Sequence, residues 1–181
     1  PMIVMAPKSL LRHKMVVSSL AEMGPDTRFR RVFPETDRLV LDKNIRRVVM
    51  CSGKVYFDLL QYRRDNGIKD VAIIRVEQLY PWPRQTLFQQ LARYPNADVV
   101  WCQEEPANQG SWTFIYPRLD AMLEVLDSKK AVRPLYAGRE AAASPATGLA
   151  SVHAQEQQKL VVDALTVDAD DLAQPFRRGD Y

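Results

Sequence analysis

Three short, uninterrupted apolar runs constrain the fold of this chain more than any other feature of its sequence. They cover Ile45–Cys51, Asp70–Val76 and Ala97–Gln103. None of them alternates strictly between apolar and polar residues, which is typical of strands that are covered on both faces. The runs therefore predict the buried strands of a parallel sheet.

Helical patterns separate and follow these runs. Apolar residues recur at helical spacing over Lys54–Asn66, Pro83–Tyr94, Ser111–Leu126 and Val152–Leu165. A fourth apolar run, Val132–Tyr136, is expected to add a strand. Alternation of this kind predicts a three-layer α/β domain, in which a mostly parallel sheet carries helices on both faces.

The pattern predicts one domain over residues 1–165, followed by a flexible tail over residues 166–181. Residues 1–44 form an irregular leading segment. Within it, Met2–Met5 could be a strand and Lys8–Glu22 one or two short helical turns. Gly24–Asn44 is rich in charge and turn residues, and is either an ordered excursion or a flexible insert. Because the chain starts at Pro1 and not at Met, we expect a piece of a longer protein.

Composition argues against several classes of protein. No apolar run approaches the ~20 residues of a membrane span, so we expect no membrane partner. The net charge is +3, and the basic residues are not interleaved with aromatic ones, so we expect no nucleic acid partner. Cys51 and Cys102 each end an apolar run, which suits small core residues in a reducing compartment. The two histidines are far apart and no CxxC pair exists, so we expect no zinc site.

No complete active site is visible. The dinucleotide, phosphate-loop, nucleophile-elbow and zinc-protease patterns are all absent. Ser52-Gly53-Lys54 joins a strand to a helix, and is either a plain turn or a place where helix amides and Lys54 bind an anion. The loop Glu77–Pro83, stiffened by two prolines, either packs internally or forms an interface. Glu77 would then pair locally or with a neighbouring subunit.

A second loop, Glu104–Gly110, follows the third run. Side chains alternate along an extended chain, so Glu104 and Glu105 should not form a catalytic pair; we expect one to be buried and hydrogen-bonded and the other exposed. Asn108 and Gln109 suit locking of the loop, because an amide both donates and accepts. His153 is expected to pack or to hydrogen-bond near a helix start, with proton transfer or ligand contact as the alternative.

Several motifs follow one another in a fixed order. They are Ile3–His13, Val48–Tyr56, Asp70–Pro81, Trp101–Gly110, and Tyr136–Arg139 with Ala143–Gly148 and Val152-His153. Together they closely resemble the C-terminal domain of the thiamine-diphosphate-dependent 2-oxoglutarate dehydrogenases, over about residues 1–165. The resemblance implies a transketolase C-terminal-like α/β fold.

The resemblance also implies an activity for the longer protein. In that family the full chain oxidatively decarboxylates 2-oxoglutarate in the tricarboxylic acid cycle and succinylates the lipoyl group of the succinyltransferase component. Thiamine diphosphate and Mg²⁺ bind between the preceding domains of a homodimer. The present chain would then be inactive alone, and would support dimer assembly and the active-site entrance. The implied location is the cytoplasm of a bacterium, or the mitochondrial matrix of a eukaryote.

Particular residues follow from the same resemblance. Actinobacterial members carry an acyl-CoA regulatory site on this domain, which points to Lys54, Gln78 and Arg84 as a regulatory anion site. The residues expected at an interface or in the entrance loops are Glu77, Glu104, Asn108, Gln109, Ser144 and His153. Two alternatives stay open: a stand-alone regulatory module that binds an acyl-CoA or nucleotide, and pyruvate or transketolase chemistry on the same fold.

Overall fold

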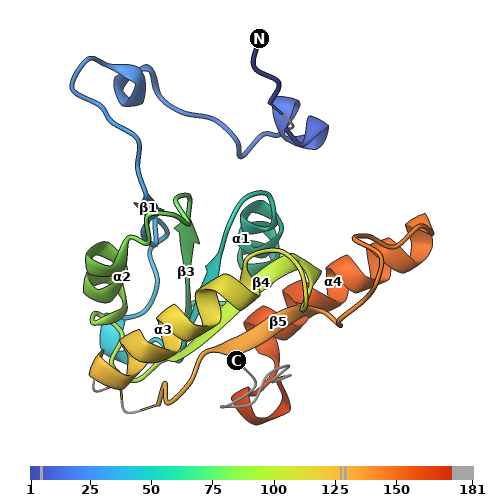
Figure 1. Ribbon diagram of the computed structural model, residues 1–181. Helices are drawn as coiled ribbons and strands as arrows, with labels where there is room; N and C mark the ends of the chain where they lie inside the picture. Colours follow the sequence, from blue (N-terminus) through green and yellow to red (C-terminus); the bar gives the residue numbers. More distant parts are fainter. Residues whose placement is uncertain (5, 127, 129, 173–181) are drawn as a thin grey trace. The chain divides into compact units, whose positions relative to one another are not determined.

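The computed structural model describes residues 1–4, 6–126, 128 and 130–172, and the chain divides into two units, Pro1–Arg30 and a body from Arg31 onward (Figure 1). The first unit contains two 3-10 helices, η1 (Lys8–Arg12) and η2 (Leu20–Met23), close to the short turns that the sequence predicts. No strand forms over residues 2–4, and Met5 of the predicted strand lies outside the described residues.

The body is built on a five-stranded sheet in the order β1-β3-β2-β4-β5. The strands are β1 (Val32–Phe33), β2 (Arg47–Cys51), β3 (Val71–Val76), β4 (Asp98–Pro106) and β5 (Leu135–Arg139). Strands β2 to β5 are parallel, which confirms the mostly parallel sheet. The short edge strand β1 pairs antiparallel with β3, and its two residues leave no periodic pattern by which the sequence could reveal it.

Four α-helices cover both faces of this sheet, as the alternation of elements predicts. They are α1 (Val55–Asp65), α2 (Arg84–Leu91), α3 (Trp112–Leu126) and α4 (Ala150–Thr166). Successive residues of a strand point to opposite faces. In β2, Val48 and Met50 therefore join the core under α2 and α3, whereas Val49 and Cys51 join the core under α1 and α4. The three-layer architecture is confirmed.

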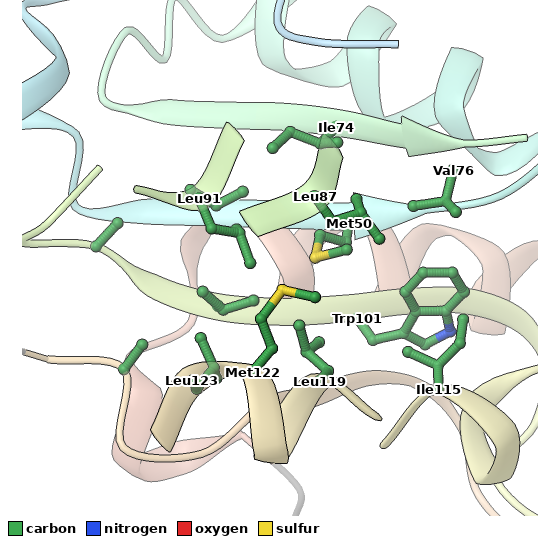
Figure 2. Packing of buried hydrophobic residues seen from close by; sticks show 14 of the residues in the cluster. Met50, Ile74, Val76, Leu87, Leu91, Trp101, Ile115, Leu119, Met122 and Leu123 are labelled. Atoms are coloured by element: carbon green, nitrogen blue, oxygen red, sulfur yellow. The ribbon is translucent and has the colours of Figure 1, made fainter. Parts of the chain in front are cut away.

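Figure 2 shows the core between the sheet and helices α2 and α3. Met50 and Trp101 rise from the sheet toward Leu87 of α2 and toward Ile115 and Leu119 of α3, and all five are fully buried. Apolar burial stabilises a fold by about 25 cal/mol per Å². The burial of apolar side chains on both faces therefore stabilises the sheet from which the loops extend.

Strand β5 lies three residues further along the chain than the predicted run Val132–Tyr136. Pro134 has no N–H to give to a ladder, and the Val132 side chain is 76% exposed, so the first part of this apolar run is not a strand. Pairing begins at Leu135, opposite Val100 of β4. The shift brings Arg139 to the end of the strand, where it pairs with Pro106.

Charged residues anchor the segment that precedes β2. Glu35 accepts a hydrogen bond from the Ile73 N–H at 2.8 Å and a second from the Arg63 guanidinium of α1, also at 2.8 Å. Asp37 accepts from Arg64 at 2.8 Å. The 3-10 helix η3 (Asp42–Asn44) then leads into β2. From Arg31 onward this charge-rich segment is thus an ordered excursion.

The end of α4 is tied to the sheet by a fully buried arginine of β2. Arg47 donates to both oxygens of Asp98, at 2.7 and 3.0 Å, and to the Asp163, Ala164 and Val167 carbonyls at the end of the helix. A cation at this position also complements the helix dipole.

The predicted tail begins in an ordered form. After α4, the 3-10 helix η4 (Ala169–Asp171) leads to Leu172, which is buried against the core under α4. The rest of the predicted tail, residues 173–181, lies outside the described residues. Within the described part of the chain, no helix is both long enough and apolar enough to cross a membrane.

Candidate functional site

Most of the predicted site residues lie in loops that follow the carboxyl ends of parallel strands. Glu104 lies near the end of β4, Arg84 begins α2 and His153 lies in the first turn of α4. Ser52–Lys54 follows β2, Glu77–Pro83 follows β3, Gln109 and its neighbours follow β4, and residues 140–149 follow β5. In open α/β sheets this edge is where functional loops gather. The contacts that hold these loops therefore determine the form of the candidate site.

Gln103 organises the loop after β4, although it is not among the residues predicted for the site. Its side-chain oxygen accepts from the Trp101 indole N–H at 3.1 Å and from the Trp112 backbone N–H at 2.9 Å. Its amide nitrogen donates to three backbone carbonyls, those of Glu105, Pro106 and Gln109, at 3.2, 3.1 and 2.8 Å. A buried amide that is satisfied in this way fixes the backbone around it.

Gly110 completes that loop. Its φ of +64° belongs to the left-handed region, and a Cβ at this position would lie 3.1 Å from the Gln103 amide nitrogen and 2.9 Å from the Glu105 Cβ. A side chain would therefore be strained and crowded. The glycine is needed because the loop folds back onto Gln103.

Asn108 and Gln109 join this loop to the loop after β5. The Asn108 amide donates to the Ala142 carbonyl and accepts from the Ala142 N–H, both at 3.0 Å. The Gln109 amide donates to the carbonyls of Ala142 and Ser144, at 3.0 and 3.3 Å. The two amides thus hold the β5 loop through its backbone, and Ser144 takes part through its carbonyl.

Glu104 and Lys54 form an ion pair between the end of β4 and the start of α1. The Lys54 amine donates to the Glu104 carboxylate and lies 3.9 Å from the Asp58 carboxylate of α1. Glu104 is half-buried in this pair, whereas Glu105 is exposed. The adjacent glutamates thus differ in environment, as strand alternation predicts, and do not form a catalytic pair.

Arg139 is the second organising residue that is not among those predicted for the site. Its guanidinium donates to the Glu156 carboxylate at 2.9 Å, to the Gln157 side chain at 3.1 Å and to the Glu104 carbonyl. It therefore connects β5 with β4 and α4. One ring nitrogen of His153 lies 3.4 Å from the same guanidinium.

Glu156 holds the start of α4 to the loop after β5. The Thr147 hydroxyl donates to its carboxylate at 2.5 Å. That hydrogen bond and, after it, the one from Arg139 lower the pKa of Glu156. The Gln157 amide on the next position donates to Asp58 of α1 at 2.8 Å, so the two helices are linked as well.

The two cysteines contribute no nucleophile to this edge. Cys51 and Cys102 are register partners on β2 and β4, and both are fully buried. Burial raises the pKa of each thiol, so both stay protonated at neutral pH. They are core residues, as the sequence predicts.

The profile of the family described as 2-oxoglutarate dehydrogenase C-terminal matches residues 17–165. The chain belongs to this family. It is also 50% identical over 173 residues to the 2-oxoglutarate dehydrogenase E1 components of Brucella ovis, Brucella canis and Brucella abortus. These alignments cover 91% of the chain but 17% of each relative, so the chain spans about one sixth of their length.

The chain is also similar to a solved structure described as a split-gene transketolase, an inactive β4 tetramer. The superposition covers 80% of this chain and 45% of that one, with a TM-score of 0.48 and 16% sequence identity. The family match includes every residue predicted for an interface or entrance loop, from Glu77 to His153. The sequence resemblance to the 2-oxoglutarate dehydrogenase family is thereby confirmed.

The three residues that were predicted to bind a regulatory anion each have different surroundings, and none of their described contacts joins one to another. Lys54 is engaged by Glu104, and the Gln78 amide donates to the Pro81 carbonyl within its own loop at 2.7 Å. Arg84 is exposed in the first turn of α2. Glu77 pairs with Arg75 at 2.8 Å, so it has a local partner, which was one of the two predicted alternatives. The anion site stays a prediction.

The residues of this edge do not fit a magnesium diphosphate group. Within the described ranges, no group of three or more His, Cys, Asp and Glu side chains could hold a metal ion. Of the carboxylates at the loops, Glu104 and Asp58 face Lys54, and Glu156 faces Arg139. Glu105 and Glu140 are exposed, but they belong to no such group. An Mg²⁺ ion that carries phosphates needs carboxylate or carbonyl oxygens open to it. The described residues of this edge present no such set of oxygens.

Proposed function

We propose that this chain is the C-terminal domain of a 2-oxoglutarate dehydrogenase E1 component. The whole protein would oxidatively decarboxylate 2-oxoglutarate in the tricarboxylic acid cycle, with thiamine diphosphate and Mg²⁺ held by the rest of the polypeptide, and would pass the succinyl group to a lipoyl succinyltransferase. The observation that carries the proposal is the 50% identity to three E1 components over 173 residues. Because these relatives are bacterial, the proposed location is the cytoplasm.

The contribution of this domain would be positional. The polar groups at its carboxyl edge bind each other: Lys54 binds Glu104, Arg139 binds Glu156, and Asn108 binds the loop after β5. Such pairs fix loops but leave few groups to transfer protons or to attack a substrate. In a homodimer, this edge would form part of an interface or of the active-site entrance, and the chain alone would be inactive.

A joined protein tests the proposal. The matching C-terminal region of the Brucella ovis relative is replaced by residues 1–181, and decarboxylation of 2-oxoglutarate is measured with thiamine diphosphate and Mg²⁺. We expect turnover from the joined protein, and none from the relative without its C-terminal region or from the 181-residue chain. Turnover by the chain alone, or an inactive joined protein that is folded and dimeric, would contradict the proposal.

A further inference from the structure

Helix α4 has two halves with different surroundings. Its second half contributes Leu160, Val161, Ala164 and Leu165 to the core, whereas no residue over 150–158 is buried. In Figure 1 the first turns of α4 extend past the tip of β5. Most of the stability of a helix in a protein comes from packing of its apolar face, so the first half of α4 depends on other contacts.

Polar contacts with Arg139 of β5 hold this first half in place. Glu156 and Gln157 accept hydrogen bonds from the guanidinium, at 2.9 and 3.1 Å. The Gln157 amide also donates to Asp58 of α1 at 2.8 Å. Contacts of this kind depend on charge, whereas the apolar contacts of the second half do not. The start of α4 is therefore the part of the helix whose contacts can respond to pH.

His153 is the group in this cluster that changes its charge near neutral pH, because histidine side chains as a class titrate between pH 5 and 8. Its Nδ1 lies 3.4 Å from Nη2 of Arg139. A guanidinium has N–H donors and no acceptor, so Nδ1 must accept in this contact and the imidazole must be neutral, with its proton on Nε2. An imidazolium has a donor on each nitrogen. Protonation therefore ends the contact and brings two positive charges together.

Titratable and charged groups face His153 from β5, from α1 and from α4 itself. Arg139 is the group on β5, and it already binds Glu156 of α4. On the side of α1, His153 lines a groove of about 420 Å³ whose wall also includes Asp58, Tyr62 and Asp65. Arg139 repels an imidazolium at position 153, whereas the carboxylates of the groove attract it. The groove also gives the ring room to turn.

Asp58 is the carboxylate in this groove that the geometry favours as a partner. Gln157 donates to Asp58, and His153 precedes Gln157 by four residues, so both side chains lie on the same face of α4. The Lys54 amine, 3.9 Å from the Asp58 carboxylate, is bound more closely by Glu104. Because a carboxylate accepts several hydrogen bonds, Asp58 can accept one from His153 and keep that of Gln157.

We propose that His153 is a pH-sensitive switch at the start of α4. As a neutral imidazole it accepts a hydrogen bond from Arg139 and joins α4 to β5. As an imidazolium it leaves Arg139 and donates to Asp58, and so joins α4 to α1. The change takes up one proton from solvent and alters no covalent bond of the chain. The switch belongs to this domain and does not depend on the activity proposed for the whole protein.

A double-mutant cycle at two pH values tests this switch. The 181-residue chain is compared with His153→Gln, with Asp58→Asn and with both changes together, since Gln keeps an acceptor for Arg139 but carries no charge. Hydrogen exchange of amides 150–158 is measured at pH 5.5 and at pH 8, and each protection factor is corrected for the intrinsic rate at that pH. We expect a coupling of about threefold in protection at pH 5.5, the size of an exposed ion pair. At pH 8 the coupling should fall below about 1.5-fold, because a neutral imidazole has no charge to pair.

Asp65→Asn provides the matched control, because it removes the same charge from the same helix and the same groove. In a cycle with His153→Gln it should show a coupling below about 1.5-fold at both pH values. A coupling at Asp58 that is equal at the two pH values, or that is absent at pH 5.5, would overturn the switch. An equal coupling at Asp65 would overturn it as well, because His153 would then respond to the charge of the whole groove and not to one partner.

Discussion

Ion pairs hold both ends of the parallel strands, but a second kind of contact is added at the carboxyl ends. At the amino ends, arginines bind carboxylates and tie elements of the body together, as Arg47 does with Asp98 and Arg63 with Glu35. At the carboxyl ends, the amides of Gln103 and Asn108 bind backbone carbonyls and tie loops to loops. The first set is needed for the body to hold together, whereas the second sets the shape of one surface. Five substitutions test this distinction.

The largest loss of stability is expected at the amino end. Arg47→Met leaves the Asp98 carboxylate, with a side chain 14% exposed, without its partner, and removes the donor from three carbonyls at the end of α4. Breaking one side of a buried ion pair costs about 3–5 kcal/mol. We expect a fall of that size in the free energy of unfolding, measured by urea denaturation.

Arg46→Met is the matched control. Arg46 pairs with Asp70 at 3.0 Å, but both side chains are partly exposed, at 34% and 44%. The loss there should stay near 1 kcal/mol or below. Equal losses for the neighbouring arginines would show that the buried pair has no special part in holding the body.

At the carboxyl end, Gln103→Leu should cost about 2–3 kcal/mol, because buried donors and carbonyls lose their partner. The signature that separates it from Arg47→Met is local: amides 104–112 should exchange faster than the global unfolding rate allows. Gln109→Ala, which cuts only the bridge to the β5 loop, should cost about 1 kcal/mol. Unchanged exchange at 104–112 in Gln103→Leu would break the comparison.

An effect that depends on pH is expected at Asp37, which pairs with Arg63 and Arg64 of α1. Hydrogen bonds from Arg64 and, after it, from Arg63 lower its pKa from 3.8 to about 2, against the opposing effect of burial. A carboxyl group with a lower pKa in the folded state stabilises the protein above pH 4, and this contribution is lost as pH falls toward 2. Solvent screening reduces it to about 1–2 kcal/mol.

Asp37→Asn measures this contribution directly. The difference in unfolding free energy between the native protein and the variant should be full at pH 6 and should shrink between pH 4 and pH 2. A difference that is constant over this range would assign the loss to packing instead of charge.

Continuous apolar runs made the central strands predictable, because a strand buried on both faces needs an unbroken series of apolar residues. The same reasoning failed at Val132, where an apolar run precedes a proline, and at Val32–Phe33, where the strand has only two residues. Local sequence therefore identifies the central strands, misplaces the start of β5 and gives no signal for β1.

The organising residues of the candidate site were harder to predict. Arg139 binds Glu156 and Gln157, 17 and 18 positions away, and Gln103 acts on a loop whose form depends on Gly110. Such contacts exist only after the strands are in register. One local signal was present for Gln103: a polar side chain at the end of an apolar run, directly before a loop with Pro, Asn and Gly.

The burial of Cys51 and Cys102 has a practical consequence for labelling of the chain with thiol-reactive dyes. Both native thiols are inaccessible and protonated at neutral pH, so a maleimide dye should react with them slowly while the protein is folded. A cysteine introduced at the exposed position Ala143 would then take the dye selectively, without removal of the native pair. The native cysteines of the folded chain would therefore contribute little background to fluorescence measurements at the loop after β5.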